Sequence, residues 1–121
     1  MVVYNRHAAS VGEARSWVDA FLGERAIDGS VRDDAQLVVS ELITNALMHG
    51  AGALVLRASI SDTAVQVSGT DSGDHMPEVL PLDPLRIGGL GLVVVDRIAS
   101  DWGVAPFPGG KTVWAALSLS G

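Results

Sequence analysis

The sequence predicts an α/β two-layer sandwich, in which helices cover one face of a single, mainly antiparallel or mixed sheet. Stretches with helical and strand-like periodicity follow one another in the order α-α-β-β-loop-α-β-β. The strand-like stretches come in two adjacent pairs, each with a short turn between its members, which is typical of antiparallel hairpins. This order indicates one sheet packed against one layer of helices.

Composition narrows the class of protein further. The 121 residues fit one domain over 1–121, and 48% hydrophobic against 18% charged residues can support a folded core. The net charge of −6 offers no basic footprint for nucleic acid or an anionic membrane, and no apolar run approaches the ~20 residues of a membrane span. The chain contains no cysteine, and Met1–Ala8 does not resemble a signal peptide. We therefore expect a cytoplasmic domain without direct nucleic-acid or membrane contact.

Two helices are expected in the first half of the chain. The first begins after Ser10, which forms a capping box with Glu13, and stops at Gly23. The second opens at Ser30 and ends near His49. Both carry apolar residues at helical spacing, in the first at Ala14, Trp17, Val18, Phe21 and Leu22 and in the second at Leu37, Val38, Val39, Leu42, Ile43, Ala46 and Leu47.

The second half of the chain predicts two hairpins separated by a loop and a helix. Strand patterns cover Ala53–Ile60 and Thr63–Thr70, and again Trp102–Phe107 and Thr112–Leu119. Between the hairpins, a glycine cluster leads into a helix that ends near Ser100. The stretch Asp71–Ile87 contains three prolines and reads as a long loop, a length that is uncommon unless the loop is functional, often as a lid.

Three polar residues lie one helical turn apart in the second helix. Glu41, Asn45 and His49 have i, i+4 spacing, so their side chains share a face within reach of one ligand. A solvated helix edge accounts for such a row by spacing alone, but the rest of this helix has few polar residues. The three residue types suit phosphoryl transfer, because a carboxylate deprotonates a hydroxyl, an amide oxygen binds Mg²⁺ and an imidazole reaches phosphate oxygens.

Three glycine-containing segments supply further candidate sites. Asp71-Ser72-Gly73 follows a strand, where a carboxylate can accept a hydrogen bond from a base amino group, although an ordinary turn has the same residues. The cluster Gly88–Leu92 runs into a helix and exposes backbone N–H groups that can hold phosphate. Gly110-Lys111-Thr112 opens the last strand, and there a ligand contact and a plain hairpin turn are equally good readings.

Taken in order, four segments resemble the boxes of the GHKL ATPases, the superfamily that includes the histidine kinases. They are Glu41–Gly50 (ELITNALMHG), Asp71–Gly73 (DSG), Gly88–Leu92 (GGLGL) and Gly110–Thr112 (GKT). The branch that the chain resembles most is that of the stand-alone anti-sigma-factor serine kinases. That likeness also rests on Ala14-Arg15, Val39–Ala46, Asp101–Val104 and Gly110–Trp114, so it extends over nearly the whole chain.

The resemblance implies a Bergerat-type ATP-binding fold with ATP and Mg²⁺ as cofactors. By position, Glu41 is the expected catalytic base, Asn45 the expected Mg²⁺ ligand, and His49 a basic residue near the nucleotide. Asp71, supported by Gly73, is the expected adenine-binding carboxylate.

The resemblance places the remaining nucleotide contacts in the later boxes. Thr112 is expected near the adenine, and Arg86 is the candidate phosphate contact from a lid over about 72–88. The expected phosphate loop comprises Gly89, Leu90, Gly91 and Leu92. Two positions depart from the family pattern, because His75 stands where a second glycine is common and Leu90 where arginine is common.

The function implied by this resemblance is that of an anti-sigma factor with serine/threonine-protein kinase activity. Its partners would be a sigma factor and a STAS-domain anti-anti-sigma protein, the phosphoacceptor, and relatives commonly form homodimers. Two alternatives stay open. The two departures favour a non-catalytic, ATP-responsive anti-sigma binding module, and the superfamily also includes the ATPase domain of histidine kinases.

Overall fold

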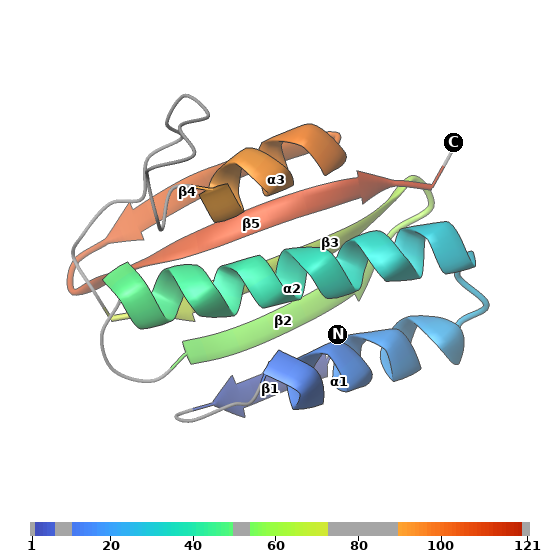
Figure 1. Cartoon of the computed structure of the whole chain (residues 1–121), viewed down its shortest axis with the longest axis horizontal. Coiled ribbons are helices and arrows are strands. Elements are labelled where there is room, and N and C mark those ends of the chain that lie inside the picture. The colour runs from blue at the N-terminus through green and yellow to red at the C-terminus, as the bar shows by residue number, and fades with distance from the viewer. Residues whose placement is uncertain (1, 7–10, 50–53, 73–89, 120–121) are drawn as a thin grey trace.

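Three helices lie on one face of a five-stranded antiparallel sheet in the computed structural model of the chain (Figure 1). The structure describes residues 2–6, 11–49, 54–72 and 90–119, and the element counts refer to these residues. The helices are α1 (Val11–Gly23), α2 (Gly29–His49) and α3 (Leu90–Ile98). The strands are β1 (Val2–Arg6), β2 (Leu54–Ile60), β3 (Ala64–Asp71), β4 (Asp101–Phe107) and β5 (Gly110–Ser118).

The strand order of the sheet is β1-β2-β3-β5-β4, and every neighbouring pair is antiparallel. The chain passes from β3 through α3 to the edge strand β4, and β5 then returns between β3 and β4. In this register Thr70 pairs with Thr112 and Asp71 with Lys111. The end of β3 therefore lies beside the start of β5, although some 40 residues separate them in the sequence.

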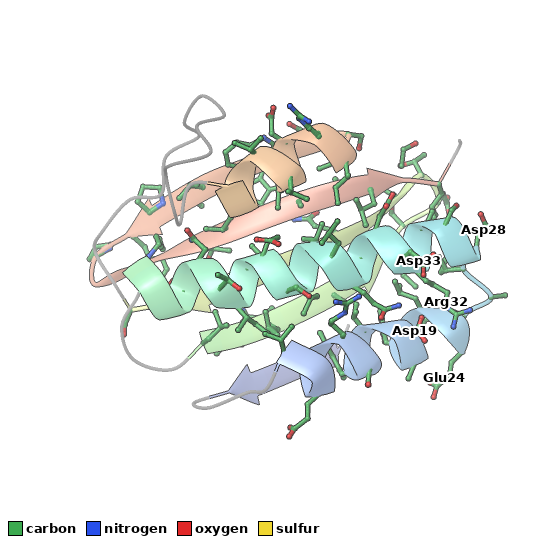
Figure 2. All side chains as sticks on the ribbon, in the orientation of Figure 1. Asp19, Glu24, Asp28, Arg32 and Asp33 are labelled. Carbon is green, nitrogen blue, oxygen red and sulfur yellow. The ribbon has the colours of Figure 1, made fainter. Side chains whose placement is uncertain are left out.

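Helices α1 and α2 are joined by a bidentate ion pair near their connection (Figure 2). Arg32 donates from Nε to Asp19 Oδ1 at 2.9 Å and from NH2 to Oδ2 at 3.1 Å, and Gln36 Nε2 also donates to Asp19. The hydrogen bond to Asp19 raises the pKa of Arg32. This fork geometry fixes the relative position of two helices that also share an apolar interface.

The core fills the space between the helices and the facing side of the sheet. Fully buried side chains come from every helix and from the central strands, among them Leu22, Val38, Ile43, Leu56, Val67 and Val95. Trp17 and Trp102 pack partly buried against this core, as expected for large aromatic residues. Trp114 lies elsewhere, against Gly103 on the side of the sheet opposite the helices.

The structure confirms the expected fold class, both hairpins and all three helices, close to the expected bounds. It adds β1, which the sequence reading did not predict and which pairs with β2 at one edge of the sheet. The hairpin between β4 and β5 turns at Gly109, whose φ of 89° favours glycine. Nearly all of the expected loop and lid lies outside the described residues.

Candidate functional site

The row of polar residues on α2 lies within an apolar part of that helix. Asn45 is buried, with 6% of its surface exposed, and Glu41 is half-buried. Their neighbours Leu42 and Ile43 are buried in the core. Burying polar groups in such surroundings is unfavourable unless they are paired, so a solvated helix edge does not account for Asn45. The backbone of His49 ends the helix, and its side chain lies outside the described residues.

The carboxyl group of Glu41 is perturbed by its position. Burial raises the pKa of Glu41 above the ordinary value of 4.5, because desolvation disfavours the charged form. A carboxylate with a raised pKa is a stronger base than an exposed one. The side chain is therefore better suited to accept a proton from a substrate than a surface glutamate would be.

Helix α2 approaches β3 closely beside these residues. Gly69 has no side chain, and a Cβ built at its position would lie 3.6 Å from the Cβ of Leu42. Figure 1 shows that α2 and β3 run in the same direction. From this contact, Asn45 lies three residues further along the helix, about 4.5 Å, and Asp71 two residues further along the strand, about 6.6 Å. Asn45 and Asp71 therefore both lie beyond the Gly69–Leu42 contact, in the same direction along their elements.

Asp71 forms a buried ion pair that the sequence reading missed. Lys111 Nζ donates to Asp71 Oδ1 at 3.0 Å, and the two residues are 0% and 5% exposed. The alternation of side chains along β5 could have predicted that Lys111 faces the core. Lys111 shares its parity along β5 with Val113, Ala115 and Leu117, which all face the core.

Thr112 lies on the other side of the sheet from Asp71. Its hydroxyl is 2.8 Å from the hydroxyl of Thr70, one rung before the Asp71–Lys111 pair. Since successive side chains of a strand point to opposite faces, this rung faces away from the helices. The structure does not bring Thr112 together with Asp71, and Lys111 occupies the facing position.

The hairpin turn also supports the position of Asp71. Gly110 is buried, and a methyl group there would overlap the backbone carbonyl oxygen of Asp71 and approach the Phe107 ring to 2.7 Å. A glycine at this position therefore permits the close approach of the hairpin to the end of β3.

Only part of the expected phosphate loop is described. Helix α3 begins at Leu90, so Leu90, Gly91 and Leu92 supply backbone N–H groups at a helix start, the arrangement expected of a phosphate loop. Gly73, Arg86 and Gly89 lie outside the described residues. So does His75, one of the two departures from the family pattern.

A hollow of about 590 Å³ lies at the other end of α2, where that helix begins. Its wall includes Ile27 and Val31 from one side and Ile98, Leu117 and Leu119 from the other. None of the residues expected to bind nucleotide lines it. This hollow is therefore separate from the candidate site, which is recognised by its buried polar groups.

Fold and site together define a two-layer α/β domain with buried polar residues on its central helix and at the adjoining ends of two strands. The chain belongs to the family of histidine kinase-like ATPase domains, whose family model matches residues 5–117. A comparison with curated proteins gave no match.

Several solved structures have the same fold. The structure of the RsbU and RsbW domains of Rv1364c from Mycobacterium tuberculosis matches with a TM-score of 0.71 at 20% identity, over 97% of this chain and 32% of that one. The catalytic domain of histidine kinase ThkA matches with 0.58 at 17% identity, over 98% and 96%. Histidine kinase AdeS of Acinetobacter baumannii matches with 0.56 at 17% identity, over 100% and 69%. The chain thus spans about a third of the first structure, and these likenesses establish the fold.

No helix in the described part of the chain is long and apolar enough to cross a membrane.

Proposed function

We propose that the chain binds ATP and Mg²⁺ between α2 and the adjoining ends of β3 and β5, and that it is an anti-sigma factor with serine-protein kinase activity. Its phosphoacceptor would be a STAS-domain anti-anti-sigma protein. One observation carries the proposal: a half-buried Glu41 and a buried Asn45 lie one turn apart on the helix that packs against β3, the strand that ends in Asp71. Membership of the ATPase family and the resemblance to serine kinases support the same function.

The donor set suits a metal ion that is held jointly with a nucleotide. Mg²⁺ commonly takes one or two protein ligands and completes its shell with phosphate oxygens and water. The amide of Asn45 is one such ligand, and the described residues contain no group of three or more acidic, histidine or cysteine side chains that would hold a metal alone. When bound with ATP, Mg²⁺ neutralises charge on the phosphates.

Each residue then has a defined role in the transfer step. Asp71 accepts a hydrogen bond from the adenine amino group, and the N–H groups at the start of α3 hold phosphate oxygens. Glu41 orients the serine hydroxyl of the acceptor and takes its proton. The serine oxygen forms the new bond to the γ-phosphorus while the bond from phosphorus to the departing ADP oxygen breaks.

Phosphate transfer from labelled ATP to a co-encoded STAS protein tests this function. We expect transfer by the wild-type chain and a loss of about 100-fold or more in Glu41→Gln, because general-base catalysis contributes about 10²–10⁴-fold. Glu24→Gln is the matched control, since Glu24 is exposed at the connection after α1. Equal transfer by wild type and Glu41→Gln would contradict the assigned base.

The second candidate is an ATP-responsive anti-sigma module without catalysis, which the departures His75 and Leu90 favour. It predicts ATP binding by calorimetry and ATP-dependent binding of a sigma factor, with no phosphate transfer to any co-encoded STAS protein. That set of results would replace the kinase proposal, and absence of ATP binding at millimolar concentration would exclude both.

A further inference from the structure

A lysine faces the candidate base-binding carboxylate across the sheet. Asp71 and Lys111 are cross-strand partners, with Nζ and Oδ1 3.0 Å apart. The alternation of buried residues along both strands places them on the helix-covered face, in line with Val67 and Val113. Lys111 is fully buried and its ammonium group donates to Asp71, so we assign it an action through that carboxylate.

This pair determines which hydrogen bonds Asp71 can make. A lysine ammonium group has three donors and no acceptor, so the oxygen it contacts must accept. An ionised carboxylate accepts at both oxygens, offers about four lone-pair positions and donates nothing. A purine 6-amino group is a donor and complements such a carboxylate. A 6-oxo group presents an acceptor there and is rejected, because two acceptors cannot pair.

We propose that Lys111 is a positioning residue that sets purine specificity, by holding the carboxylate of Asp71 as an acceptor for a 6-amino group. This inference rests on the proposed ATP site. It adds that the choice of a 6-aminopurine depends on a residue that does not touch the base. A purely structural role of the ion pair would affect stability and overall affinity, but it would leave the ratio of affinities for the two classes of purine unchanged.

Calorimetric titration of the full chain with Mg·ATP and Mg·ITP measures that ratio. We expect the wild type to prefer ATP by about tenfold or more, since leaving a buried polar group unpaired weakens binding by at least that order. Lys111→Met should lose most of this preference, because a buried carboxylate that has lost its counter-ion favours the protonated form, which can donate a hydrogen bond. Lys111→Arg keeps a cation at this position and should keep the preference. A folded Lys111→Met chain that retains the wild-type ratio overturns the inference.

A second pair of variants tests whether Lys111 sets the purine preference in chains that have no carboxylate at position 71. These variants remain informative if Lys111→Met does not fold. In Asp71→Asn, Lys111 draws the amide oxygen toward itself and turns the amide N–H₂ toward the ligand, so ITP should bind more tightly than ATP. In Asp71→Asn/Lys111→Met the amide can take either orientation, and the preference should shrink to about twofold or less. Equal ratios in these two variants would overturn the role of Lys111. A wild-type chain that binds neither nucleotide would overturn the ATP site itself, and this inference with it.

Discussion

The buried ion pair predicts a strong energetic coupling between β3 and β5. Asp71 and Lys111 are 5% and 0% exposed and are joined by a 3.0 Å contact, so removal of either partner leaves a buried charge without its counter-ion. We consider the apolar replacements Asp71→Leu and Lys111→Met, alone and together. The two together remove both charges and place apolar side chains at both positions.

The expected magnitudes follow from this burial. Breaking a buried pair by removing one partner typically lowers the free energy of unfolding by about 3–5 kcal/mol, whereas replacing both partners by apolar groups is often neutral or stabilising. If each single variant loses about 3 kcal/mol and the double variant loses little, the coupling energy is about 6 kcal/mol, the sum of the two single losses. With a denaturant slope of about 1.5–2 kcal/mol per molar urea, each single variant shifts the unfolding midpoint down by about 1.5–2 M.

Urea unfolding followed by circular dichroism, on the four chains of the cycle, measures this coupling. The pair Arg25–Glu24 provides a matched control, because its atoms are 3.7 Å apart and its side chains are 45% and 75% exposed. Such surface pairs couple by about 0.2–1 kcal/mol. A coupling energy for Asp71 and Lys111 no larger than that of the surface pair would refute this prediction. It would mean that each buried charge is stabilised by groups other than its partner in the pair.

Three further predictions concern the site. Because burial raises the pKa of Glu41, kcat/KM for phosphate transfer should fall as pH decreases, with an inflection above 4.5. An inflection at or below that ordinary value would contradict the role of Glu41 as the base. Gly110→Ala should lower the free energy of unfolding by about 1–3 kcal/mol and also lower the ATP affinity, because the new methyl group displaces the backbone of Asp71. Urea unfolding measures the first effect and calorimetry the second. An unchanged unfolding midpoint would show that the hairpin adjusts freely to the methyl group. Thr112→Val should lower the free energy of unfolding by about 0.5–1.5 kcal/mol, because the hydrogen bond to Thr70 is lost, while the ATP affinity stays within about twofold of the wild type. A larger loss of ATP affinity would favour the contact between Thr112 and the nucleotide that the family resemblance implies.

The parts of the fold that the sequence predicts are those encoded by local periodicity. The second helix has its apolar residues at helical spacing, and each hairpin has two strand patterns with a short turn. Strand β1 was missed for a physical reason. Its five residues end in Asn5 and Arg6, and as an edge strand it depends on pairing with β2, about 50 positions away along the chain. A short segment stabilised by such distant pairing leaves little local signal.

The residues of the candidate site also differ in whether local sequence or distant pairing determines their position. Glu41 and Asn45 could be predicted together because one helix fixes their spacing, and Asp71 stands out at the end of a strand. The pairing of Asp71 with Lys111 depends on the register between two strands that are not consecutive, and a shift of one residue would have brought Thr112 to that face instead. The family resemblance drew attention to the threonine, whereas alternation along β5 indicated the lysine.

Buried polar groups point to the same candidate site independently of the family. Four polar or charged residues are buried among those described, namely Ser40, Asn45, Asp71 and Lys111. Ser40 has a local explanation, since its hydroxyl donates to the Gln36 carbonyl oxygen at 2.9 Å, a bond within α2. The other three lie on α2, β3 and β5, where those elements approach one another, in a core that is otherwise apolar. A fold that needed only stability could fill these positions with apolar residues, because a buried ion pair is often no more stabilising than an apolar replacement. The presence of a carboxylate, an ammonium group and an amide at these positions therefore favours the proposed ligand recognition over a role in stability alone.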